Sequence, residues 1–186
     1  MKKGIVDLLL KTGKLKNIKR AGWVREKFPD PESVAEHTFR VCFLALILAE
    51  DLKLERSRLL EMALLHDIEE FSTFDPVTQR GSENVANHDH VLEKKVVREL
   101  FSPLKKADEY YKIWEEHIPQ SNPGAPRISS ILYQIGKIAT AWQALEYELA
   151  RENPKKLDEW WKNAKVYVKE PLLVELLKAL EKRRQK

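Results

Sequence analysis

The chain has 186 residues, 43% of them hydrophobic and 33% charged, which excludes intrinsic disorder as its overall state and suits one domain with its own core. The net charge is only +4, and part of that excess lies in the C-terminal residues 182–186, so we expect no nucleic-acid partner. The single cysteine, Cys42, excludes an intrachain disulfide and the cysteine-rich zinc folds. Histidine, with five copies, is therefore the remaining soft metal ligand.

Two apolar stretches bear on the location of the protein. The longest, residues 41–49, is far shorter than the ~20 residues that a membrane-spanning helix needs. The apolar run near the N-terminus is interrupted by Asp7 and ends at Lys11 without a small-residue cleavage site, so it is not typical of a signal peptide. We therefore expect no membrane association and a cytoplasmic location.

Apolar residues recur at helical spacing through most of the chain, and alternating strand patterns are scarce, which predicts an all-α fold of about seven or eight helices. The first helix is short, over residues 5–10, and a basic connection follows over residues 11–30. The second begins at a capping box formed by Ser33 and Glu36 and runs to about residue 52. The third runs from about residue 55 to 71, and residues 73–80 have an irregular pattern.

The second half of the chain continues the helical pattern. A polar helix or extended loop from residue 83 leads into the next element. Further helices are expected over residues 90–101, 107–117 and 127–152, with a proline-rich loop over residues 119–126, then two more helices that Pro154 and Pro171 separate, the last over residues 172–182. No repeat or low-complexity linker interrupts this pattern. We therefore predict a single domain over residues 1–186, with the helices of residues 155–186 packed on the rest.

His66 and Asp67 end an otherwise apolar helical stretch, where a charged side chain needs a partner or a metal because buried charge is costly. Glu70 follows four residues after His66, so on a helix the three side chains share roughly one face. His37 belongs to a separate predicted helix and could face the same point. Imidazole and carboxylate together suit zinc, manganese, iron, cobalt or nickel. A solvated helix end is the alternative interpretation of the same residues.

Four stretches around these residues resemble a known family: RAGW at residues 20–23, PESVAEH at 31–37, LLHDIEE at 64–70 and QALEYE at 143–148. They resemble the HD-domain metal-dependent phosphohydrolases, and among these the small single-domain branch that contains the 5′-deoxynucleotidases. The resemblance covers roughly residues 5–150. It implies an all-α HD domain, a homodimer or larger homo-oligomer, and hydrolysis of a nucleoside 5′-monophosphate to nucleoside and phosphate.

The resemblance also implies a role for individual residues. His37, His66 and Asp67 would hold a divalent metal ion, and Glu70 would position or activate the attacking water. Asp75 would lie near the scissile phosphate and the sugar, while Arg20 and Trp23 would bind the substrate, with Arg20 on the phosphate. This distribution suits the chemistry, because a guanidinium matches phosphate oxygens in a bidentate fork and a carboxylate can take a proton from water.

Two positions depart from the family pattern. The family's fourth ligand is an Asp in an Asp-Lys-Leu-Glu motif, where this chain has GKIA starting at Gly136, and the family's Gly-Asp pair is here Phe74-Asp75. A glycine inside a helix costs about 1 kcal/mol relative to alanine. Three interpretations stay open. In the first, the site uses three protein ligands plus water or substrate. In the second, the fourth ligand is His88, Asp89 or His90, which otherwise suit a polar loop or helix start. In the third, the protein is a catalytically degenerate HD domain with a nucleotide-binding or assembly role.

Overall fold

Helices make up most of the described part of the chain, which in this computed structural model comprises residues 2–75, 89–118, 124–150 and 154–184. In these residues the order is α1 (Lys2–Thr12), the 3-10 helix η1 (Gly13–Asn17), α2 (Ala21–Arg25), α3 (Val34–Leu48), α4 (Arg56–Leu65), α5 (Glu70–Thr73), α6 (His90–Phe101), α7 (Ala107–His117), α8 (Arg127–Leu149), α9 (Pro154–Tyr167) and α10 (Pro171–Arg184). An isolated antiparallel bridge joins Lys19 to Ser33. The predicted all-α class is confirmed.

The predicted elements correspond to the eight longer helices, although α3 ends at Leu48 rather than at about residue 52, and the additional helices are short. The region predicted as a connection over residues 11–30 contains η1 and α2. The predicted helix over residues 55–71 is wrong in one respect, because α4 ends at Leu65 and a turn over residues 66–69 separates it from α5. Within that turn, Ile68 N donates to Leu65 O at 3.1 Å, and Glu70 N donates to Asp67 O at 3.3 Å. These bonds span three residues rather than four, so the α-helical path tightens into a turn there.

The predicted capping box at the start of α3 is confirmed. The Ser33 backbone N and Oγ donate to Glu36 Oε2 at 2.6 and 2.7 Å, and Glu36 N donates to Ser33 Oγ at 3.2 Å. These bonds satisfy donors that the first turn of a helix leaves without an intrahelical partner. They determine where α3 begins, and His37 therefore lies in its first turn.

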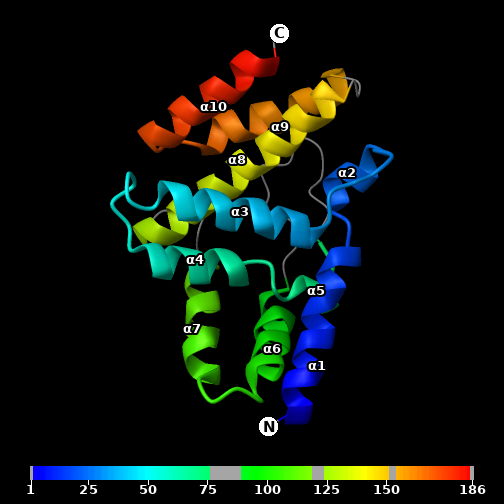
Figure 1. Ribbon diagram of the computed structural model, residues 1–186, viewed down its shortest axis with the longest axis vertical. Helices are drawn as coiled ribbons and strands as arrows, with labels where there is room; N and C mark the ends of the chain where they lie inside the picture. The colour runs from blue at the N-terminus through cyan, green and yellow to red at the C-terminus, as the bar shows by residue number, and fades with distance from the viewer. Residues whose placement is uncertain (1, 76–88, 119–123, 151–153, 185–186) are drawn as a thin grey trace. The chain divides into compact units, whose positions relative to one another are not determined.

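The chain divides into two units, one of Met1–Thr38 with Leu64–Glu116 and the other of Phe39–Ala63 with His117–Lys186. In the first unit, η1 contacts both α1 and α5, and α5 also contacts α6. Helices α6 and α7 form an antiparallel pair (Figure 1) in which the Arg98 guanidinium lies 3.7 Å from the centre of the Tyr111 ring. That the whole chain forms a single domain stays a prediction.

In the second unit, α9 and α10 both pack on α8 (Figure 1). The side chain of Gln134 in α8 accepts hydrogen bonds from the backbone N of Lys169 and of Glu170 at 2.7 and 2.8 Å, which fixes the start of α10. At the other end of α10, Arg184 donates to Glu148 of α8 at 2.8 Å. Across the described ranges, no helix is both long and apolar enough to cross a membrane.

Candidate metal centre

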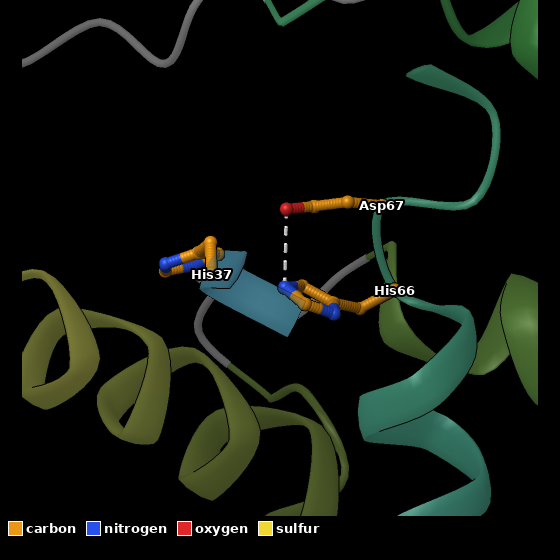
Figure 2. Close-up of side chains that lie close together, drawn as sticks. All are labelled: His37, His66 and Asp67. Atoms are coloured by element: carbon orange, nitrogen blue, oxygen red, sulfur yellow. Dashed lines mark ion pairs between the residues drawn. The ribbon is translucent and has the colours of Figure 1, made fainter. Parts of the chain in front are cut away.

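Three of the predicted site residues converge in the first unit. His37 comes from the first turn of α3, whereas His66 and Asp67 come from the turn after α4. One potential ligand atom from each residue lies within 4.8 Å of the others. Figure 2 shows the Asp67 carboxylate and the His66 ring facing each other, at 3.1 Å between Oδ2 and Nε2, with His37 beside them. The structure therefore brings the three predicted ligands together, although through a turn rather than along one helix face.

Burial and charge at this cluster favour an anionic carboxylate beside two imidazoles. His37 and His66 are 3% and 7% exposed. Burial alone would raise the pKa of Asp67, but the contact with His66 and the charge of Arg20 hold that pKa well below its usual range. Two imidazole nitrogens and one carboxylate oxygen are a donor set that suits zinc, manganese, iron, cobalt and nickel.

Arg20 connects this cluster to Asp75. Its Nη1 lies 3.2 Å from Asp67 Oδ2 and 3.2 Å from Asp75 Oδ1. The other oxygen of Asp75 accepts a hydrogen bond from the backbone N of Ala21. Burial tends to lower the pKa of Arg20, but the charges of Asp75 and Asp67 raise it above its usual value, so the guanidinium stays charged. Both contacts use Nη1, and among the described residues neither Nη2 nor Nε has a hydrogen-bond partner.

Glu70 is the next predicted site residue, and its side chain is buried. Its Oε2 has no hydrogen-bond partner in the described part of the chain. Burial, and then the charges of Asp67 and Asp75, raise the pKa of Glu70 well above its ordinary value. A buried polar atom without a partner is costly, so this oxygen and the three converging ligands fit a site built for a cation.

The alternative fourth ligands of the sequence analysis have other contacts. Asp89 caps α6, where its carboxylate accepts from the backbone N of Val91 and of Leu92 at 3.2 and 3.0 Å. His90 Nδ1 lies 2.8 Å from Glu93 Oε2. Both residues therefore serve the start of α6, as the polar-helix interpretation predicts. His88 lies outside the described residues. Gly136 lies inside α8 and offers no side chain.

Trp23 has a buried position. Its ring is 1% exposed and packs edge-on against Phe28, with 5.5 Å between the ring centres. Its Nε1 donates to Glu32 Oε2 at 3.1 Å. A contact between Trp23 and the substrate stays a prediction.

Two buried carboxylates near the cluster were missed at the level of sequence. Glu32 lies behind His37, and its position inside the PESVAEH stretch was a signal that could have identified it. Glu69 accepts a hydrogen bond from Trp114 Nε1 of α7 at 2.7 Å, which ties the turn over residues 66–69 to that helix. Burial, and then the charge of Asp67, raise the pKa of Glu69. No spacing in the sequence indicates this second contact.

Comparisons with known proteins agree on one family. The sequence model described as HD domain matches residues 12–174. The chain is similar to the 5′-deoxynucleotidase HDDC2 of Xenopus laevis, with 29% identity over 98% of this chain and 88% of that protein. The protein of the same name from Danio rerio is 30% identical over 92% of this chain and 84% of its own length. Among solved structures, a conserved hypothetical protein from Pyrococcus furiosus superposes with a TM-score of 0.73 and 30% identity, covering 97% of this chain and 99% of that one.

Proposed function

Since this chain belongs to the HD domain family, we propose that it is a metal-dependent phosphohydrolase that removes the 5′-phosphate from deoxynucleoside monophosphates. The observation that carries this function is the convergence of His37, His66 and Asp67 within 4.8 Å. The relatives named 5′-deoxynucleotidase, which match nearly the whole chain, support the substrate class.

His37, His66 and Asp67 are the residues that would hold the divalent ion. When bound, such an ion stabilises negative charge on the phosphate and makes a water molecule more acidic. Cobalt, manganese, nickel, zinc and iron all accept nitrogen and oxygen ligands, so the donor set admits each of them. Three protein ligands are enough for a catalytic site that leaves a position open.

Arg20 is the proposed phosphate-binding residue. Asp67 and Asp75 both contact its Nη1, so they hold the guanidinium in place. Nη2 and Nε remain for two parallel hydrogen bonds to phosphate oxygens. Asp75 also accepts from the backbone N of Ala21, and we assign it the place next to the scissile phosphate and the sugar.

Glu70 is the proposed general base. Its buried Oε2, which lacks a hydrogen-bond partner among the described residues, can accept a proton from the attacking water. The water oxygen forms a bond to phosphorus while the bond from phosphorus to the 5′ oxygen breaks. The proton that Glu70 took from the water passes to the departing 5′ oxygen, which regenerates the carboxylate, and the products are the nucleoside and inorganic phosphate.

We further propose that the protein acts in the cytoplasm as a homodimer or larger homo-oligomer, as the family resemblance implies. Exposed apolar side chains on one side of α3 support an interface there: Phe39, Leu46 and Ile47 are 67%, 45% and 50% exposed. Light scattering of the purified protein tests this assembly. A monomeric molar mass at all accessible concentrations would contradict it.

Phosphate release tests the proposed activity. Purified protein is supplied with Mn²⁺, Co²⁺, Ni²⁺ or Zn²⁺ in turn, and each deoxynucleoside monophosphate is offered as substrate. We expect release with at least one ion, and loss of at least 100-fold in rate for His66→Ala because a ligand is removed. The control is Leu64→Ala, which changes an exposed side chain two residues before His66 and should retain the wild-type rate. Metal binding without phosphate release from any substrate would favour the degenerate, nucleotide-binding alternative.

A further inference from the structure

A buried carboxylate lies behind the first proposed metal ligand. Glu32 Oε2 is 3.9 Å from His37 Nδ1, and the two side chains are 1% and 3% exposed. Because both side chains are buried, the contact bears on the stability of the Glu32 carboxylate, which is costly to bury unless a donor or a positive charge compensates it. Glu32 has no role in the proposed hydrolysis.

The position of Glu32 is fixed from two directions. Trp23 Nε1 donates to the same Oε2 at 3.1 Å. In the backbone, Arg20 N donates to Glu32 O at 2.8 Å, and Val34 N donates to Ile18 O at 2.9 Å, on either side of the bridge between residues 19 and 33. A carboxylate held in this way has little freedom to turn away from His37.

A second tryptophan–glutamate pair, in which the carboxylate is half-buried, provides a comparison for Glu32. In the other unit, Trp161 Nε1 donates to Glu148 Oε1 at 3.3 Å, and the Glu148 carboxylate is paired with Arg184 at 2.8 Å. That carboxylate is compensated by a guanidinium and serves the packing of α8 and α10. The Glu32 carboxylate instead lies 3.9 Å from an imidazole that belongs to the proposed metal centre, and it also interacts electrostatically with Arg20.

We propose that Glu32 is a positioning residue for His37. At 3.9 Å from Nδ1, which is longer than a hydrogen bond, the carboxylate electrostatically favours the tautomer that carries its proton on that nitrogen, and this leaves the lone pair of Nε2 for a metal. Trp23 acts one step further back, by holding the carboxylate. This role rests on the metal site of the proposed function, but not on the phosphatase reaction.

Cobalt binding to the full chain tests the role of Glu32 without catalysis. The dissociation constant is measured by titration with Co²⁺, and the visible absorption of the bound ion reports its ligands. We expect Glu32→Gln to weaken binding by about 10- to 100-fold and to change the cobalt spectrum, since the oriented imidazole is lost. The matched control is Glu148→Gln, which alters a half-buried carboxylate that also accepts a hydrogen bond from a tryptophan Nε1, and it should leave both readouts unchanged.

A double-mutant cycle separates positioning from general structure. If Glu32 acts through His37, Glu32→Gln should weaken cobalt binding no further in a His37→Ala background. Additive effects of the two changes would overturn the proposal. Trp23→Phe, which removes only the Nε1 donor, should weaken binding in the same direction but less, whereas Trp161→Phe should not.

The outcomes distinguish this role from the activity itself. If Glu32→Gln binds cobalt with the wild-type affinity and spectrum, the positioning role fails while the proposed phosphatase stands. If the wild-type chain binds no cobalt, manganese or zinc, both the metal site and the role of Glu32 fail. Should circular dichroism show that Glu32→Gln is unfolded, the comparison of Trp23→Phe with Trp161→Phe decides, and equal cobalt affinities there would overturn the role.

Discussion

Phe74 and Gly136 both depart from the family pattern, but the backbone conformations at the two positions differ. Phe74 has φ 62° and ψ 162°, a conformation that is essentially reserved for glycine. Gly136 lies inside α8, where an added Cβ would meet no heavy atom within 4 Å. The chain therefore has a bulky residue where the backbone favours glycine, and glycine where the backbone accepts any ordinary residue.

The unusual conformation of Phe74 is explained by its neighbour. Phe74 N donates to Glu70 O at 3.1 Å, which ends α5, and the chain must then place Asp75 against Arg20 and the backbone N of Ala21. Strain of this kind costs about 1–3 kcal/mol and persists only where surrounding contacts determine the conformation. The backbone at position 74 therefore keeps a conformation typical of glycine although the residue is phenylalanine, and Asp75 still reaches Arg20 and the backbone N of Ala21.

At Gly136 the space is available and only the side chain is absent. The difference from position 74 is that nothing in the local backbone requires glycine, so what the chain lacks there is a carboxylate. Gly4 gives a third case, because an added Cβ would lie 2.6 Å from Pro103 Cβ. Substitution of glycine by alanine should therefore lower the stability of the fold at position 4 in α1 and raise it at position 136 in α8.

The largest effect is expected for Gly4→Ala. The added methyl group meets the rigid ring of Pro103, and overpacking of this kind costs about 1–3 kcal/mol. We expect the free energy of unfolding to fall by that amount in urea denaturation. An unchanged or increased stability would show that α1 can move away from Pro103 at little cost.

The next effect is expected for Phe74→Gly. Relief of the strain at φ 62° should stabilise the fold. The greater freedom of glycine in the unfolded chain reduces this gain by about 0.5–1 kcal/mol, so we expect the free energy of unfolding to rise by about 1 kcal/mol. Phe74→Ala is the control, since it removes the ring but keeps the strain. If both variants are equally stable, the backbone at position 74 is not strained.

Much of the fold was predictable because local signals determine it. The bounds of α6 and α7 are those expected from the sequence, and the capping box of Ser33 and Glu36 gave the start of α3. The break after Leu65 was missed because residues 66–69 contain no glycine or proline, and apolar periodicity does not report a turn of ordinary residues.

The candidate site was predictable only as a set of residue types. The family resemblance named His37, His66 and Asp67, and the structure brings them together. Their environment comes from partners far apart in the chain: Arg20 reaches Asp67 across 47 positions, and Trp114 reaches Glu69 across 45. No local pattern encodes such pairs, because they form only when segments far apart in the chain pack together.

An effect on metal affinity rather than on stability is expected for Gly136→Asp, which restores the residue type that the family resemblance implies as the fourth ligand. An added Cβ at position 136 meets no heavy atom within 4 Å, so we expect the variant to fold. We expect its affinity for Co²⁺ to rise about tenfold, which corresponds to about 1.4 kcal/mol. The control is Gly136→Asn, which has nearly the same shape without the charge. Equal affinities of the two variants would show that a carboxylate at this position does not reach the metal.

The smallest effect is expected for Gly136→Ala. Alanine in place of glycine in a helix interior contributes about 1 kcal/mol, because it restricts the unfolded chain and meets no steric obstacle here. For a chain of this size the melting temperature should rise by about 2–4 °C in calorimetry. Because alanine offers no ligand, cobalt affinity should stay at the wild-type value, which separates the cost of glycine in α8 from the loss of a carboxylate. A destabilised Gly136→Ala would mean that α8 needs glycine for a close approach, and the contrast with Gly4 would then disappear.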